Sequence, residues 1–219
     1  MPLPTVYQLF KKLLTRYGEQ NWWPGDSPFE VMVGAILTQN TSWINVEKAI
    51  EKLKDVSALN ATKLLATPHE MLADWLRPVG YFNVKATRLR NFCQWFIEAG
   101  DLQKLQNQDT HSLRQNLLAV KGIGPETADD ILLYAFDRPV FVIDAYTRRL
   151  FQRLGYIDDN PAYEELRMWF EEKLRRVAGK VQVFNEYHAL IVHHAKYFCK
   201  SKPECSSCCL NSICKSKTV

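Results

Sequence analysis

The chain has 219 residues, of which 47% are apolar, and its formal net charge is only +4. This length and apolar content are enough for a substantial core in one or two domains. The apolar stretch of residues 6–14 is interrupted by Lys11 and Lys12, so we see no secretory or membrane-spanning segment and expect a protein that stays inside the cell.

Apolar residues recur at helical spacing through almost the whole chain, and no segment alternates as a strand would. The first amphipathic face consists of Val6, Leu9, Phe10, Leu13, Leu14 and Tyr17. Further helices are predicted within residues 29–37, 46–53, 71–76 and 85–97. Pro139 precedes the apolar run 140–143, which indicates a crossing segment and not part of a sheet. The sequence therefore predicts an all-α fold.

A glycine hairpin lies between two further helical patterns, in the segment VKGIGPETA of residues 120–128. Gly122 and Gly124 permit a tight turn and a close approach of the backbone to a ligand. The amide groups at the start of the following helix suit a phosphate oxygen, and such contacts position a nucleic acid without reading its bases. Taken alone, the pattern also fits a plain turn between packed helices.

Asp144 follows the hairpin, within VIDAY of residues 142–146. A carboxylate near a sugar can stabilise positive charge that develops there and can orient or deprotonate a water molecule. The apolar spacing after Asp144 predicts a helix that begins just beyond it, so the same side chain also fits an N-cap. An aspartate can perform both roles.

Four cysteines near the C-terminus, Cys199, Cys205, Cys208 and Cys214, have the spacing C-x5-C-x2-C-x5-C. In a cytosolic chain such clustering favours an inorganic centre over disulfides, and iron–sulfur clusters are held by cysteine quartets of this kind. A four-cysteine zinc site and a metal-free tail are the alternatives. Cys209 is a fifth thiol in this segment, whereas Cys93 lies in an apolar run and is interpreted as a core thiol.

Positive charge gathers in the same region. Residues 193–219 contain Lys196, Lys200, Lys202, Lys215 and Lys217 against Glu204. A phosphate-binding surface needs such a concentration of charge, although a solvated lysine-rich tail has the same composition.

In this order, the segment GAILTQNT of residues 34–41, the hairpin, Asp144 and the segment HALIVHH of residues 188–194 before the cysteines form a specific combination. Over nearly its full length the chain resembles a helix-hairpin-helix (HhH-GPD) DNA glycosylase of the endonuclease III superfamily. The resemblance implies a two-lobed fold: a six-helix barrel with the hairpin motif in residues 21–137, and a cluster-bearing domain from residues 1–20 and 138–219. DNA would lie between the lobes.

The resemblance also implies a base excision repair enzyme whose partner is double-stranded DNA with a damaged base. Such a protein is a monomer and cytoplasmic, and it associates with the nucleoid when bound to DNA. The family carries a structural [4Fe–4S] cluster, which assigns Cys199, Cys205, Cys208 and Cys214 as its ligands. The cluster loop presents basic side chains to DNA, here Lys200 and Lys202.

Asp144 corresponds to the catalytic residue of the family. The DNA-binding candidates besides the two lysines are Gln39, Asn40, Lys121, Gly122, Gly124 and Thr127. The side chain corresponding to Gln39 enters the base stack in the family, as wedges do in kinked duplexes; a buried amide that bonds to the backbone is the plain alternative. Pro78 and Gly80 predict a loop over residues 76–82, in which Tyr81 is a candidate intercalating side chain.

Two departures from the family pattern have chemical consequences. The first cysteine spacing is x5 where the family has x6, so either the loop tightens or Cys209 replaces a ligand. Glu126 stands where bifunctional members carry a lysine, and Lys121 lies on the other side of the turn. Without that amine no Schiff base forms at the sugar. We therefore expect a monofunctional enzyme that leaves an abasic site.

The aromatic residues bear on which base is removed. Trp22, Trp23, Trp43 and Glu126 are candidates for the base pocket, because the segments 22–24 and 39–43 resemble the 3-methyladenine branch of the superfamily. Alkylated purines are often cationic and suit an electron-rich aromatic pocket, in which a flipped base is read by stacking. Tryptophans near helix starts also serve as core residues.

Two other functions stay open on the sequence. One is an endonuclease III-like glycosylase for oxidised, deaminated or mismatched bases, with weak cleavage of abasic sites. The other is a DNA-binding module without catalysis, against which Asp144 argues, because phosphate binding gains nothing from a nearby carboxylate.

Overall fold

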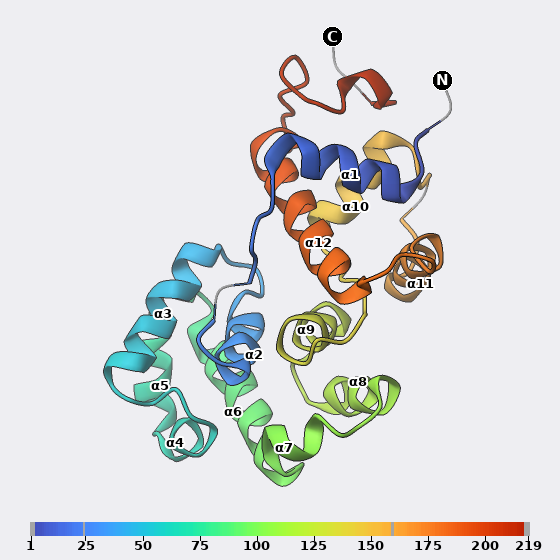
Figure 1. The fold of residues 1–219 in the computed structure, drawn as a ribbon. Helices are drawn as coiled ribbons and strands as arrows, with labels where there is room; N and C mark the ends of the chain where they lie inside the picture. The colour runs from blue at the N-terminus through green and yellow to red at the C-terminus, as the bar shows by residue number, and fades with distance from the viewer. Residues whose placement is uncertain (1–2, 24, 159, 217–219) are drawn as a thin grey trace. The chain divides into compact units, whose positions relative to one another are not determined.

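The computed structural model describes residues 3–23, 25–158 and 160–216. Across these residues the chain forms helices joined by turns and contains no strand, as Figure 1 shows, so the all-α prediction is confirmed. Pro24 of the predicted pocket segment and Lys217 of the lysine-rich tail lie outside the described residues. No helix of the described part of the chain is both long and apolar enough to cross a membrane.

The chain divides into two compact units, which we call the hairpin unit (residues 23–138) and the cysteine unit (residues 1–22 and 139–219). The hairpin unit contains α2 (Pro28–Leu37), α3 (Trp43–Asp55), α4 (Ala61–Ala66), α5 (His69–Trp75), the 3-10 turn η1 (Arg77–Val79), α6 (Phe82–Glu98), α7 (Asp101–Leu105), α8 (Thr110–Ala119), α9 (Pro125–Asp130) and the π-helical turn η2 (Ile131–Ala135). The cysteine unit contains α1 (Val6–Tyr17), α10 (Ala145–Leu154), α11 (Tyr163–Lys173), α12 (Lys180–Tyr197) and the 3-10 turn η3 (Asn211–Ile213).

Helix α2 forms the centre of the hairpin unit. It begins at Pro28 because the Ser27 side chain accepts a hydrogen bond from the Glu30 amide and a proline fits the first helical position. Every residue from Glu30 to Leu37 is buried, and the helix contacts α3, α6, α9 and η2. A helix that is apolar all round is expected to be buried in this way.

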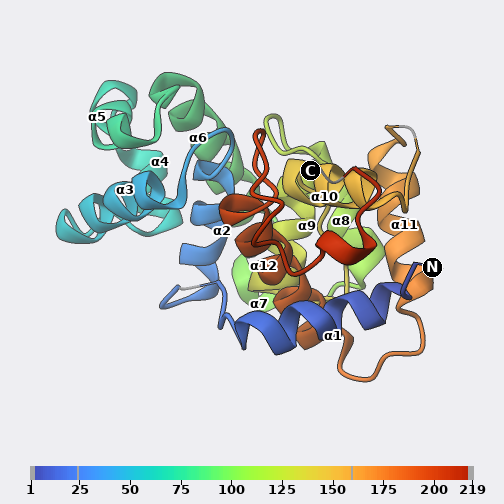
Figure 2. The ribbon, with the colours of Figure 1, turned by 90° about the horizontal axis from the view of Figure 1, so that it is seen from above.

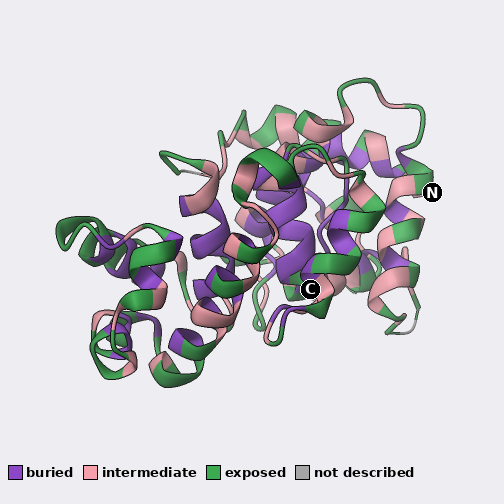
Figure 3. Cartoon of the chain, turned by 90° about the horizontal axis from the view of Figure 1, so that it is seen from below, coloured by how far each residue is buried: buried purple, intermediate pink, exposed green. Residues whose placement is uncertain are grey.

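In the cysteine unit, α1 packs on α12, which also contacts α10 (Figures 1 and 2). A capping box between Thr5 and Gln8 starts α1 one residue before its first buried side chain. The Tyr187 hydroxyl on α12 donates a 2.9 Å hydrogen bond to the Val6 carbonyl in the core. Buried and exposed residues occupy different faces of most helices, as the colours in Figure 3 show.

Residues 140–143 form a buried extended segment and not a strand, as predicted. Two of its backbone amides donate to side chains of α11: Phe141 to Glu171 Oε1 at 3.1 Å and Ile143 to the Tyr163 hydroxyl at 3.3 Å. The Phe141 ring stacks on Phe170, with 4.2 Å between the ring centroids. Asp144 follows this segment directly and lies at the start of α10.

Candidate active site and cysteine cluster

The hairpin turn joins α8 to α9 and is closed by a 3.0 Å hydrogen bond from the Ile123 amide to the Val120 carbonyl. Gly122 has a φ of +103°, which favours glycine, and an added Cβ would lie 2.4 Å from Cγ of Arg88. Gly124 instead has an ordinary extended backbone, and an added Cβ would meet no atom of the protein within 4 Å. Of the two hairpin glycines, only Gly122 is therefore required by the protein itself.

A buried ion pair fastens the two helices of the motif. Arg114 on α8 donates to both carboxylate oxygens of Asp129 on α9, at 2.6 and 3.0 Å. Such bidentate pairing fixes geometry more strongly than a single contact does. The hairpin is thereby held between two helices whose spacing is set by a salt bridge.

Gln39 lies beside the hairpin, and its side-chain amide is fully engaged. Nε2 donates to the Gly122 carbonyl at 3.1 Å and to Thr127 Oγ1 at 2.9 Å. Oε1 accepts a hydrogen bond from Arg88 of α6. These hydrogen bonds are those expected of an amide bonded to the backbone, which is the alternative to a side chain that enters the DNA stack. Thr127, which is a predicted DNA contact, is buried.

The other predicted contacts of the hairpin unit are exposed. Asn40 has a left-handed backbone with φ +56°, and Lys121 and Glu126 are exposed at the hairpin and in the first turn of α9. Tyr81 also has a left-handed backbone, with φ +45°, and 74% of its surface is exposed. Bulky residues rarely adopt this conformation, and such strain gathers at functional sites.

The structure brings two of the three predicted pocket tryptophans together. The rings of Trp23 and Trp43 meet edge to face, with 4.9 Å between centroids, and Tyr134 lies 4.8 Å from Trp23. Both indoles press on α2 at Gly34, where an added Cβ would lie 3.3 Å from Trp23 and 3.4 Å from Trp43. Tyr134 lies in the π-helical turn η2. The helical periodicity of the sequence did not indicate that its ring contacts Trp23.

Trp22 belongs to the cysteine unit. Its ring stacks on that of His188 on α12, with 5.7 Å between centroids and an interplanar angle of 4°. His188 in turn faces Asp144: Nε2 lies 3.5 Å from Oδ2. The sequence placed His188 in a family motif, but nothing local indicated that it faces the carboxylate.

Asp144 is the N-cap of α10 and is 9% exposed. Oδ1 accepts a 2.6 Å hydrogen bond from the Thr147 amide. Burial by itself raises the pKa of this carboxyl, but the hydrogen bonds and charge of His188 and the hydrogen bond from Thr147 outweigh it, so the pKa lies below its ordinary value. The carboxylate is therefore held as an anion, with its helix cap intact.

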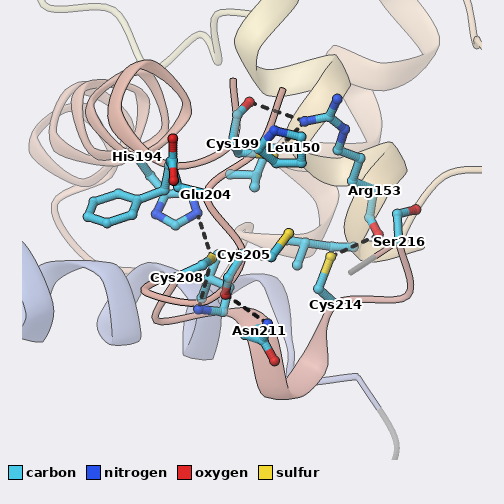
Figure 4. Close-up of a pocket in the computed structure, with 14 residues that line it drawn as sticks. Leu150, Arg153, His194, Cys199, Glu204, Cys205, Cys208, Asn211, Cys214 and Ser216 are labelled. Atoms are coloured by element: carbon cyan, nitrogen blue, oxygen red, sulfur yellow. Dashed lines mark hydrogen bonds between the residues drawn. The ribbon is translucent and has the colours of Figure 1, made fainter. Parts of the chain in front are cut away.

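All four predicted ligand cysteines line one pocket of the cysteine unit (Figure 4). Cys199 follows α12 and the others lie on the loop before and after η3. Within residues 3–23, 25–158 and 160–216, no three His, Cys, Asp or Glu side chains are grouped closely enough to hold a metal ion.

Hydrogen-bond donors approach the sulfur atoms of this pocket. Arg153 of α10 lies 3.4 Å from Cys199 Sγ and also donates to the carbonyls of the following loop, which fastens that loop to the helix. The Leu210 amide lies 3.4 Å from Cys208 Sγ, and His194 Nε2 lies 3.5 Å from it (Figure 4). Such donors stabilise thiolates bound to metal centres.

Cys209 does not line the pocket. Its Sγ lies 3.7 Å from the hydroxyl of Tyr17 on α1, which also bonds to His194 Nδ1 at 2.8 Å. Of the two predicted lysines, Lys200 forms an exposed ion pair with Glu204 at 3.2 Å, and Lys202 is exposed. The loop therefore carries positive charge at its surface while four sulfur atoms line the pocket behind it.

Comparisons with known proteins agree with these features. Residues 33–176 match the model of the HhH-GPD superfamily of base excision DNA repair proteins. A putative DNA repair glycosylase of Methanocaldococcus jannaschii is 46% identical, over 97% of this chain and 96% of that protein. Endonuclease III of Sulfolobus acidocaldarius is 31% identical, over 85% of this chain and 81% of that protein.

Among solved structures, a 3-methyladenine DNA glycosylase (MagIII) of H. pylori bound to 1,N6-ethenoadenine is similar, with a TM-score of 0.79 and 30% identity, over 88% of this chain and 98% of that one. The family match covers more than half of the chain, and the solved structure shares its fold. The chain therefore belongs to the HhH-GPD superfamily of base excision repair DNA glycosylases.

Proposed function

We propose that this protein is a monofunctional DNA glycosylase that removes alkylated bases of the 3-methyladenine type from double-stranded DNA. Asp144 is the observation that carries the proposal. It is a buried carboxylate whose pKa lies below the ordinary value, so it is an anion at neutral pH. Cleavage of an N-glycosidic bond passes through an oxocarbenium-like sugar, which a fixed anion stabilises.

The low pKa also indicates which role Asp144 plays. An efficient general base has a pKa near the working pH, whereas a depressed pKa makes the carboxylate a weak base. We therefore assign Asp144 chiefly to electrostatic stabilisation of the sugar cation, with a water molecule adding to the anomeric carbon. The departing base must then be a good leaving group. An N3-methylated adenine meets this condition, because it carries positive charge in DNA and leaves as a neutral base.

Three features support the alkylated base as substrate. Trp23, Trp43 and Tyr134 form an electron-rich group of rings in the hairpin unit, and such surfaces attract cationic bases. The similar H. pylori enzyme is a 3-methyladenine glycosylase. Its bound ligand, 1,N6-ethenoadenine, is also a modified purine, which makes ethenoadenine a second candidate for this chain.

Glu126 supports a monofunctional reaction. It is exposed in the first turn of α9, at the position where a lyase would need its amine. Without an amine to form a Schiff base with the sugar, the covalent intermediate that leads to β-elimination and strand cleavage does not form. The product is then an intact strand with an abasic site, and strand breaks require alkali.

We further propose that Cys199, Cys205, Cys208 and Cys214 hold a [4Fe–4S] cluster. The four thiols line one pocket, and cysteine quartets are the usual ligands of such clusters. When bound, the cluster would fasten the C-terminal loop. That loop would present Lys202, and Lys200 once its ion pair with Glu204 opens, to the DNA backbone.

The alternative is a glycosylase for oxidised, deaminated or mismatched bases, which the likeness to endonuclease III favours. Free bases released from methylated, uracil-containing and oxidised duplexes distinguish the two. We expect 3-methyladenine from methylated DNA and no release by Asp144→Asn protein. Release of uracil or an oxidised pyrimidine in place of 3-methyladenine would favour the alternative.

A further inference from the structure

Helix α6 places two cations three residues apart on one face, Lys85 and Arg88. Lys85 is 1% exposed, and its ammonium donates to the Leu37 carbonyl at 2.9 Å and the Val79 carbonyl at 2.7 Å. Leu37 ends α2 and Val79 ends η1. One buried side chain therefore joins the ends of two elements that are far apart in the sequence.

Lys85 is a costly choice for this position. Within the described part of the chain its ammonium has no carboxylate partner, and both of its acceptors are neutral carbonyls. Burial, with a smaller effect from the nearby Arg88 charge, lowers its pKa to about 8. An apolar side chain of similar size would avoid this cost. In return, the lysine fixes the distance between the Leu37 and Val79 carbonyls.

Arg88 extends the same arrangement to the hairpin. Its guanidinium donates to Gln39 Oε1, and Gln39 Nε2 donates to the Gly122 carbonyl and to Thr127 Oγ1. The stem of Arg88 also packs against Gly122, where no Cβ would fit. The two cations thus reach three turns of the hairpin unit: residues 38–42, 79–81 and 120–124.

Each of these turns contains a residue with a left-handed backbone: Asn40 at φ +56°, Tyr81 at +45° and Gly122 at +103°. For Tyr81 this conformation is strained and persists only when the surrounding structure enforces it. Asn40 and Tyr81 are also exposed. The turns that carry these two exposed residues are therefore held by contacts of Lys85 and Arg88.

We infer that Lys85 and Arg88 are positioning residues, which we call the α6 brace, and that they hold Tyr81, the turn after α2 and the hairpin in one register for insertion into DNA. The inference rests on the proposed DNA glycosylase function but not on the identity of the excised base. Tyr81 enters the base stack, and the hairpin binds the backbone at a distance that the brace fixes.

The test is a double-mutant cycle between the brace and Tyr81. The probe is a duplex with a tetrahydrofuran abasic-site analogue next to 2-aminopurine, whose fluorescence rises when a side chain unstacks it. In protein that retains Tyr81, we expect Lys85→Met and Arg88→Met each to reduce the rise in 2-aminopurine fluorescence about tenfold. In Tyr81→Ala protein the same substitutions should change the fluorescence little, because coupled residues do not have additive effects. Arg88 is half-buried, so its variant tests the brace even where Lys85→Met fails to fold.

Asp109→Ala is the matched control, because it removes the N-cap of α8 in the same unit without touching the brace. We expect it to lower thermal stability and leave the fluorescence signal unchanged. Equal losses in the presence and absence of Tyr81, or no loss in either, would overturn the inference. The assay involves no base excision. If the fluorescence results contradict the α6 brace but the same preparations still release 3-methyladenine, the inference is wrong and the proposed glycosylase function is unaffected.

Discussion

Asp144 Oδ2 and His188 Nε2 lie 3.5 Å apart in the cysteine unit, and this pairing sets the charge state of the proposed catalytic carboxylate. Burial favours the protonated acid, whereas His188 and the Thr147 amide favour the anion. The folded-state pKa lies below the unfolded one, so the stabilisation from this pairing is present at neutral pH. It is lost as the pH falls through the folded-state pKa.

His188→Phe removes the nitrogen but keeps a ring that can stack on Trp22. We expect the pKa of Asp144 to rise, since burial is then opposed only by Thr147. The acid limb of the pH profile of kcat/KM for base release should move to higher pH. His193→Phe is the control, because His193 packs against Tyr17 and Tyr197. An unchanged acid limb in His188→Phe would show that His188 does not set this pKa.

Asp144→Asn tests the carboxylate without removing the helix cap. The asparagine oxygen can still accept from the Thr147 amide, so the free energy of unfolding should change by less than about 1 kcal/mol. Loss of the anion should lower the single-turnover rate of base release by about a hundredfold or more. DNA affinity should stay unchanged. A variant that keeps the wild-type rate would remove Asp144 from the reaction.

Glu126→Lys restores an amine at the lyase position. Glu126 is exposed in the first turn of α9, where the helix dipole disfavours a cation, so the substitution should lower the free energy of unfolding by about 1 kcal/mol. We expect borohydride to trap a covalent protein–DNA adduct with the variant and none with the wild-type protein. Lys121→Gln serves as the control for the other amine of the hairpin. Adducts with wild-type protein that disappear in Lys121→Gln would identify Lys121 as a lyase nucleophile.

Cys208→Ser and Cys209→Ser separate the two interpretations of the shortened cysteine spacing. Cys208 lines the pocket, whereas Cys209 lies against the Tyr17 hydroxyl. We expect Cys208→Ser to lose iron and the visible absorption of the cluster, and Cys209→Ser to retain both. The opposite result would make Cys209 a ligand. Stoichiometric zinc without iron in the wild-type protein would refute the cluster.

Much of the fold could be predicted from the sequence because the long helices carry their own pattern. The face of Val6 to Tyr17 coincides with α1, and residues 29–37 differ from α2 by one residue. Helices α11 and α12 also lie outside the predicted helix ranges, although they have 11 and 18 residues. Helices α4 and α7 were not predicted because they have only 6 and 5 residues, and so few turns show no clear period. Their position is set by packing on α6.

In the candidate site, too, some features could be predicted from the sequence and others could not. The hairpin and Asp144 are local motifs and could be found by reading along the chain. The pairing of Asp144 with His188, and that of Lys85 with Leu37, join residues far apart in the sequence, so only the folded chain brings them together. Backbone conformation is also hidden: the two hairpin glycines look equivalent, yet only Gly122 has a positive φ.

The most direct test of the central claim is strand cleavage of duplexes that carry a single 3-methyladenine, assayed with and without alkali. A monofunctional glycosylase that acts through Asp144 predicts breaks only after alkali, and none with the Asp144→Asn protein. A parallel duplex with an oxidised pyrimidine should remain intact in both treatments. Alkali-independent breaks at the oxidised pyrimidine, with 3-methyladenine untouched, would contradict both the assigned substrate and the monofunctional reaction.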